Sequence, residues 1–158
     1  MKTIILTTAL ICSGIICFAQ TNLISYEDIK YILHNNLQHA DTFLTAKGYT
    51  LKSKNEKTRN REYTLPIKGG TFVNLHIRAD GKKLFMELET NELGQYNLIN
   101  NSISQYLNKS GSTGDVQTYS IKDLCNIYIT VTDTMPYDPI RKDYNMQIVA
   151  DKNVTAYN

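Results

Sequence analysis

The stretch TFVNLHIRADGKKLFMELET, residues 71 to 90, decides the fold class of this 158-residue chain. Its apolar side chains alternate with polar ones, first at Val73, Leu75, Ile77 and Ala79 and then at Leu84, Met86 and Leu88. Alternation with a period of two is typical of a strand that buries one face, and Asp80-Gly81 is a strong signal for a tight turn. The stretch therefore predicts an antiparallel hairpin with a single apolar face.

Strand-like segments continue on both sides of this hairpin. They are YTLKSK (49–54), REYTLPI (61–67), VQTYSI (116–121), LCNIYITVTD (124–133) and YNMQIVA (144–150). Pro66 lacks a backbone donor, so it ends its strand or places it at an edge. Two or three strands after residue 110 and four before residue 91 give a sheet of six or seven strands.

Helical spacing precedes each group of strands. From Tyr26 to Leu44 the apolar residues recur every three or four positions, Ser25 is a suitable N-cap, and Gly48 is a suitable stop. The pair at 35–36, both asparagines, is a poor helix interior and allows a kink or a break. A second helix is expected from Tyr96 to about residue 109. The fold class is thus α+β, with two helices packed on one face of an antiparallel sheet, in the order helix, four strands, helix, three strands.

An internal echo links the two helices. Asn35-Asn36 precedes Phe43-Leu44 and Gly48, and Asn100-Asn101 precedes Tyr106-Leu107 and Gly111. Two interpretations stay open: a duplicated helix-plus-strands unit, or two helices that end by the same chemistry.

Residues 1–19 have the pattern of a secretory signal peptide. Lys2 is followed by an apolar run of about 13 to 15 residues and by the small residue Ala19, whereas a membrane-spanning helix needs about 20 residues. Isoleucine precedes both Cys12 and Cys17, a poor setting for a bacterial lipid anchor. We expect an exported protein, periplasmic or secreted, whose single domain spans residues 20–158 and which does not bind the membrane after cleavage.

Composition narrows the function classes. The chain has 17 basic and 15 acidic side chains. Lys2 is the one charged residue of the predicted signal peptide, so its removal leaves 16 basic and 15 acidic side chains. This balance argues against general affinity for nucleic acid. Cys125 is then the one remaining cysteine, and its place in an alternating strand predicts a buried apolar side chain rather than a reactive thiol.

The stretch DTFLTAKGYTL, residues 41 to 51, follows an apolar helix and leads into a strand. It resembles the helix-to-strand junction of small secreted proteins of unknown function from Bacteroidetes-type bacteria, over residues 25 to 107. The resemblance implies export and a helix-then-sheet order, and no activity.

No motif indicates catalysis, a cofactor or a metal. His34 and His39 are five residues apart, whereas a helical zinc pair needs a spacing of three or four. Glu87 and Glu89 share one strand face beside Phe85. These carboxylates and His76 motivate an alternative function, a small secreted hydrolase or isomerase with a pocket between helices and sheet. The same pattern is typical of the solvated face of an antiparallel sheet.

The strongest charge feature is KSKNEKTRNR, residues 52 to 61. We take as candidate binding residues its five basic side chains and two nearby tyrosines: Lys52, Lys54, Lys57, Arg59, Arg61, Tyr49 and Tyr63. One interpretation is a solvated ribbon that protects a sheet edge, and the other is a contact for a protein with an acidic surface. The second leads to the function that we expect, an exported non-enzymatic binding module for another protein, such as an inhibitor, an immunity-type protein or an envelope accessory.

Overall fold

The structure is a computed structural model that describes residues 22–81, 83–133, 141–151 and 154. The predicted signal peptide, residues 1–19, lies outside the described residues, as do Cys12 and Cys17. No helix among the described residues has both the length and the apolar character needed to cross a membrane.

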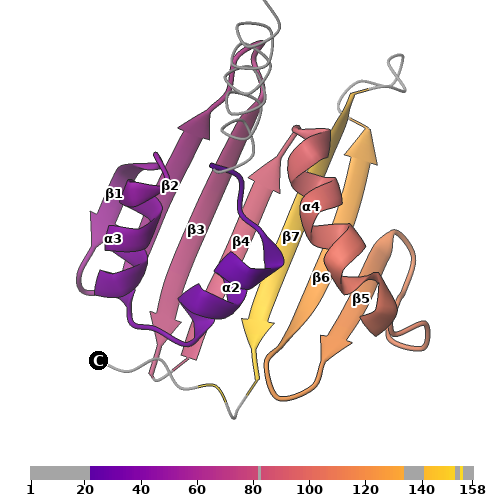
Figure 1. Cartoon of the computed structure of the whole chain (residues 1–158). Helices are drawn as coiled ribbons and strands as arrows, with labels where there is room; N and C mark the ends of the chain where they lie inside the picture. The colour runs from indigo at the N-terminus through magenta and orange to yellow at the C-terminus, as the bar shows by residue number, and fades with distance from the viewer. Residues whose placement is uncertain (1–21, 82, 134–140, 152–153, 155–158) are drawn as a thin grey trace, which may run out of the picture.

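The described residues form an α+β structure with one antiparallel sheet of seven strands (Figure 1). The helices are α2 (Tyr26–Leu33), α3 (Leu37–Ala46), α4 (Leu93–Ile103) and a short 3-10 helix, η2 (Ser104–Tyr106). The strands are β1 (Thr50–Asn55), β2 (Asn60–Pro66), β3 (Phe72–Asp80), β4 (Lys83–Thr90), β5 (Val116–Ile121), β6 (Cys125–Asp133) and β7 (Lys142–Ala150). Their order across the sheet is β1-β2-β3-β4-β7-β6-β5, and every pairing is antiparallel.

The first predicted helix is two helices, so the expectation of two α-helices was wrong by one. Helix α2 starts with a capping box, in which Ser25 and Asp28 bond each other's backbone N–H groups. Asn36 then caps a new helix, because its side chain accepts a hydrogen bond from the backbone N–H of His39 at 2.9 Å. An asparagine that bonds the backbone in this way favours a helix start over a helix interior.

The second predicted helix ends earlier than expected. Helix α4 stops at Ile103, and the tighter turn of η2 follows. Leu107 then forms an isolated β-bridge with Tyr119, which draws the chain into an extended path beside β5. Strand pairing at residue 107 therefore overrides the helical spacing of the sequence.

The predicted hairpin is present as β3 and β4, with Asp80 opposite Lys83 and Leu75 opposite Leu88. The seven alternating apolar residues named in the sequence analysis lie on the side of the sheet that the three α-helices cover. Figure 1 shows α2 and α3 in front of the β1-β4 half and α4 in front of β5, β6 and β7. The opposite side, which we call the open face, has no helix of the described residues on it.

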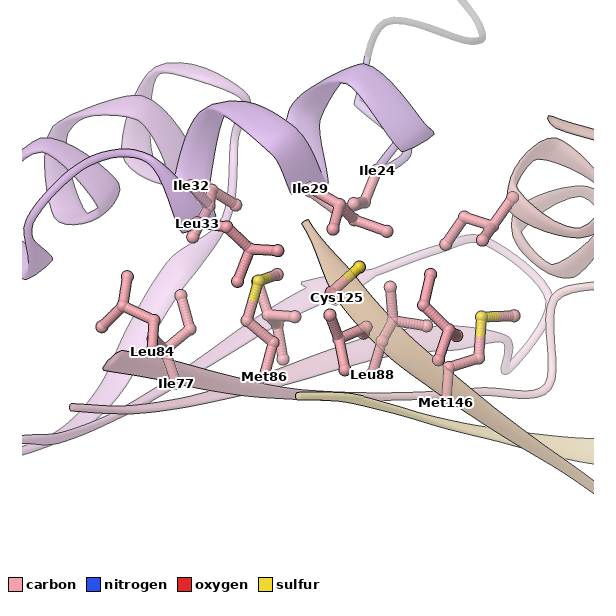
Figure 2. Close-up of a cluster of buried hydrophobic side chains, with 14 of the residues drawn as sticks. Ile24, Ile29, Ile32, Leu33, Ile77, Leu84, Met86, Leu88, Cys125 and Met146 are labelled. Carbon is pink, nitrogen blue, oxygen red and sulfur yellow. The ribbon is translucent and has the colours of Figure 1, made fainter. Parts of the chain in front are cut away.

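The core lies between the helices and the sheet. Figure 2 shows Ile29 and Leu33 of α2 pointing toward Met86 and Leu88 of β4, and Cys125 of β6 lies in the same cluster. All five side chains are buried. Cys125 therefore behaves as the small core residue that the strand pattern predicts.

A buried glutamine joins the start of the described chain to α4. The Gln95 side chain accepts from the backbone N–H of Ile24 at 2.8 Å and donates to its carbonyl oxygen at 2.7 Å. Both residues are fully buried. This pair of bonds satisfies the backbone of Ile24 without a neighbouring strand.

Candidate functional site

The basic stretch folds into the hairpin of β1 and β2, at one edge of the sheet (Figure 1). All six residues of β1 are exposed. The register shifts between Leu51 and Ser53, so Lys52 has no opposite residue on β2, as in a β-bulge. Edge position and exposure together make β1 the most accessible strand of the described sheet.

The lysines of this hairpin differ in their partners. Lys54 pairs with Glu56, at 2.7 Å between Nζ and Oε1. Lys52 and Lys57 are exposed and form no ion pair within the described part of the chain. Arg59, in the turn, is half-buried and donates from Nη1 to the carbonyl oxygen of Gly81 at 3.2 Å. The positive charge that faces solvent comes mainly from the lysines.

Arg61 and Tyr63 do not lie on the surface with the lysines. Both are buried on the helix side of β2, and the Arg61 side chain is only 6% exposed. Its guanidinium contacts Asp41 of α3 at 3.4 Å and Glu56 of the turn at 3.1 Å. The Tyr63 hydroxyl donates to the same Asp41 carboxylate. We call Asp41, Glu56, Arg61 and Tyr63 the anchor cluster, because it ties the hairpin to α3.

The environment of Tyr63 raises the pKa of its phenol well above the ordinary value. Burial is the first cause, since it disfavours the charged phenolate, and the hydrogen bond to Asp41 is the second. Tyr49 is also buried, and burial with the nearby Asp28 carboxylate raises its pKa. No described residue is a hydrogen-bond partner of the Tyr49 hydroxyl. Two of the candidate tyrosines are therefore structural neighbours of the exposed lysines rather than surface groups.

The anchor cluster was not predicted from the sequence. Asp41 lies about 20 residues before its two partners, and nothing in its local sequence indicates a buried ion pair. The alternation of Arg61, Tyr63 and Leu65 on β2 is the signal that would have indicated a common inward face.

The other edge of the sheet, at β5, is closed. The segment Leu107–Thr113 runs beside it, and we call this the sealing segment. Asn108 donates from its backbone N–H to the carbonyl oxygen of Thr118 at 2.8 Å, and Ser112 Oγ accepts from the Thr118 N–H at 3.1 Å. The Thr118 hydroxyl adds a bond to the carbonyl oxygen of Gly111 at 2.9 Å. The outward backbone groups of Thr118 are thus already satisfied.

The carboxylates considered for catalysis lie on the open face. Glu87 and His76 are opposite each other on β4 and β3, and both line a hollow of about 330 Å³ on that face. Glu62 Oε1 is 3.7 Å from His76 Nδ1, and Asn145 Nδ2 donates to Glu87 Oε1 at 2.8 Å. Glu89 lines a separate hollow with Asn145. The alternative hypothesis placed these groups between helices and sheet, and they lie on the other side.

Two further expectations concern reactive groups. Burial raises the pKa of the Cys125 thiol to about 12, so the thiolate is scarce at neutral pH. Within the described ranges, no three histidine, cysteine, aspartate or glutamate side chains are placed to hold a metal ion.

Comparison with protein families, with curated proteins and with solved structures finds no match to this chain. The candidate site is accordingly defined by its geometry. It combines an exposed edge strand, lysines that face solvent, and a buried cluster that fixes the strand to α3. Such a surface offers backbone hydrogen bonds and positive charge to a ligand.

Proposed function

We propose that this protein is an exported binding module for another protein, and that it contacts an acidic surface through β1 and the turn after it. The observation that carries the proposal is the exposure of all six β1 residues at a sheet edge that bears Lys52 and Lys54. Lys57 in the turn adds a third exposed cation.

The charges of this edge support a partner of opposite sign. Lys52 and Lys57 form no ion pair with a carboxylate of the described chain, and Lys54 shares the exposed Glu56 with Arg61. Exposed lysines interact with a partner at distances up to the Debye length of about 8 Å in physiological salt. They steer association and select partners by charge more than they add affinity.

The anchor cluster supports the same proposal because it makes the hairpin rigid. Asp41 holds both Arg61 and Tyr63, so β2 is fixed to α3 directly beneath the exposed strand. A surface that is already ordered loses less conformational entropy on binding.

The arrangement of the strands also supports duplication of a helix-plus-strands unit, which we propose as the origin of the fold. Strands β1-β2-β3-β4 and β5-β6-β7 are two consecutive meanders, and each follows a helical segment. Their last strands, β4 and β7, pair antiparallel at the centre of the sheet. Strand β1 has no counterpart strand in the second unit, so the candidate site is an addition to the repeated part.

Export is the second element of the proposal and rests on the pattern of residues 1–19. Mass spectrometry of the protein purified from its native cells is expected to find a chain that begins at Gln20. An intact N-terminus, or a fatty-acyl group on Cys17, would contradict export by this route.

The binding function is tested with matched lysine substitutions. The variant Lys52→Gln/Lys54→Gln/Lys57→Gln removes the edge charge and leaves the buried Arg61 in place. The control, Lys68→Gln/Lys109→Gln/Lys122→Gln, removes three exposed lysines elsewhere. In pull-downs from an envelope extract, wild type and control should retain an acidic protein that the edge variant loses. Identical sets of captured proteins for all three would remove the edge from the proposal.

A further inference from the structure

We propose that β1 binds its partner by strand addition, in which an extended acidic segment of the partner pairs with the outer edge of β1 as an eighth strand. This inference rests on the proposed function and names the mode of contact and the chemistry of the bound segment. The partner segment is extended, carries carboxylates and has at least one apolar side chain.

The backbone of β1 supplies the first argument. An edge strand of an antiparallel ladder turns about half of its N–H and C=O groups away from its one neighbour. Every residue of β1 is exposed, so the described residues leave this row accessible to another chain. At the opposite edge the sealing segment occupies the corresponding groups of Thr118. The sheet therefore has one edge that can accept a strand.

The lysines decide which strand can be accepted. A second copy that paired with β1 about a twofold axis through Ser53 would place Lys52 opposite Lys54 twice. Like charges opposite each other in a sheet destabilise the pairing. A strand with glutamate or aspartate at these positions gains attraction where a second copy meets repulsion. Charge complementarity thus selects an acidic segment of a different protein.

The side chains of β1 refine the chemistry of that segment. Leu51 lies opposite Tyr63, and Lys54 lies opposite Arg61. Since Tyr63 and Arg61 both point to the helix side, Leu51 and Lys54 share that side as well. Leu51 is one of the few large apolar residues that stay exposed, at 39%. A bound strand is expected to place an apolar side chain next to Leu51 and a carboxylate next to Lys54.

The experiment uses three synthetic ten-residue peptides as probes with the mature chain. The first alternates glutamate and threonine and has a central leucine. The second replaces each glutamate by lysine, and the third is the first peptide with N-methyl groups on alternate residues, which removes the donors of one edge and keeps the charge. Affinity is measured by calorimetry, and amide hydrogen exchange of β1 is followed by NMR.

We expect the acidic peptide to bind and to slow exchange of the outward β1 amides. The lysine peptide should not bind, and the N-methylated peptide should bind at least about tenfold more weakly, the equivalent of one or two backbone hydrogen bonds. The variant Lys52→Gln/Lys54→Gln should weaken the acidic peptide by a similar factor, whereas Lys109→Gln/Lys122→Gln should not. Circular dichroism of each variant checks that the fold is retained.

Each other outcome overturns a defined part. If the N-methylated peptide binds as well as its parent, strand addition is wrong and contact with an acidic partner stands. If the acidic peptide and the lysine peptide bind equally well, the proposal that the partner is acidic is wrong. Dimerisation of the wild-type protein that buries the β1 amides would make a second copy the occupant, and absence of binding by all three peptides would end the inference.

Discussion

At each edge of the sheet the chain passes from a helix into a meander of strands, and the two connections differ in structure. On one side the segment between α3 and β2 forms β1, a strand whose six residues are all exposed. On the other side, the chain between α4 and β5 contains the sealing segment, which hydrogen-bonds to the Thr118 backbone and adds no further strand to the described sheet. One helix-to-meander connection extends the sheet, and the other closes it.

This difference shows how an antiparallel sheet can be kept from uncontrolled pairing at both ends. The β5 edge is satisfied by the chain's own polar groups, with Asn108 and Ser112 as the contacts. The β1 edge keeps its backbone accessible and relies on the charge of Lys52 and Lys54. Sealing prevents all pairing, whereas charge prevents pairing with like-charged strands alone. The following predictions test that contrast, in order of decreasing effect.

The largest effect is expected from removal of the edge charge. The variant Lys52→Val/Lys54→Val makes β1 a neutral strand with high β propensity, so two copies should pair through it. Size-exclusion chromatography with light scattering should show a monomer for the wild type and larger species for the variant. The matched control Gln117→Val/Ser120→Val alters the closed β5 edge and should stay monomeric. A monomeric lysine-to-valine variant would show that charge does not protect this edge.

The second effect concerns what holds the β1 end in place. Asp41→Ala leaves the buried Arg61 with Glu56 and the Asn60 carbonyl oxygen, and it removes the acceptor of the Tyr63 hydroxyl. Breaking a fully buried pair costs 3–5 kcal/mol, and Asp41 is partly exposed, so we expect a loss of about 2 kcal/mol in the free energy of unfolding by urea. Asp115→Ala, an exposed aspartate before β5, should change it by less than about 0.5 kcal/mol. A loss of less than about 1 kcal/mol for Asp41→Ala would mean that the anchor cluster does not fix the hairpin.

Much of the sheet follows from the local pattern of the sequence. Strands such as β3 and β4 bury every second side chain, so the period of two reports their common apolar face directly. Asp80 and Gly81 predict the hairpin turn because glycine readily adopts a positive φ, and the structure has a φ of 59° at Gly81. The possible break at residues 35–36 was also visible, since two asparagines favour a cap over a helix interior.

The site was predicted less well, for reasons of distance along the chain. Five basic residues look alike in the stretch 52 to 61, yet Arg61 is buried because Asp41 lies above it on α3. The closure of β5 depends on the Ser112 and Thr118 side chains and on the backbone N–H of Asn108, which no periodicity reports. Contacts between residues far apart in sequence decide which charges reach solvent, and a single sequence carries no direct record of them.

The third prediction compares one tyrosine from each end of the sheet. Burial raises the pKa of Tyr63 and of Tyr119, and the Asp41 carboxylate raises that of Tyr63 further. A raised folded-state pKa stabilises the protein fully below the unfolded value of about 10 and less as the pH rises above it. Each tyrosine that stays neutral in the folded state should cost about 1 kcal/mol of stability between pH 10 and pH 11.

The measurement is urea denaturation of the wild type, Tyr63→Phe and Tyr119→Phe at pH 8, 10 and 11. As the pH rises from 8 to 11, both variants should lose less stability than the wild type. The advantage over the wild type should extend to a higher pH for Tyr63→Phe than for Tyr119→Phe. Equal alkaline loss in all three proteins would show that these phenols ionise in the folded state.

The fourth prediction addresses the closed edge. Ser112→Ala removes the acceptor of the Thr118 N–H, and the loss of one such bond costs about 1 kcal/mol. The exchange rate of the Thr118 amide hydrogen should rise by a factor of about five, which corresponds to that energy. Ser102→Ala is the matched control, because this exposed serine bonds only the carbonyl of Leu98 in its own helix. Unchanged exchange at Thr118 would mean that the serine does not seal the edge.

The smallest effect should come from Glu56, the exposed member of the anchor cluster. Its hydrogen bond to Lys54, and then its contact with Arg61, hold the pKa of this carboxyl below the usual range. A lowered folded-state pKa stabilises the protein above the ordinary carboxyl value and ceases to do so as the pH falls below it. Glu56→Gln should therefore lower the urea midpoint slightly at pH 7 and not at pH 3, and high salt should shrink the difference at pH 7. The loss of stability caused by Glu56→Gln should be smaller than the loss caused by Ser112→Ala. The Glu56 side chain is exposed to water, and Asp41 still contacts Arg61 in the variant. A midpoint shift that persists at pH 3 would mean that Glu56 stabilises the β1 hairpin through packing and not through its charge. Electrostatics at this residue would then no longer distinguish the β1 edge from the sealed β5 edge.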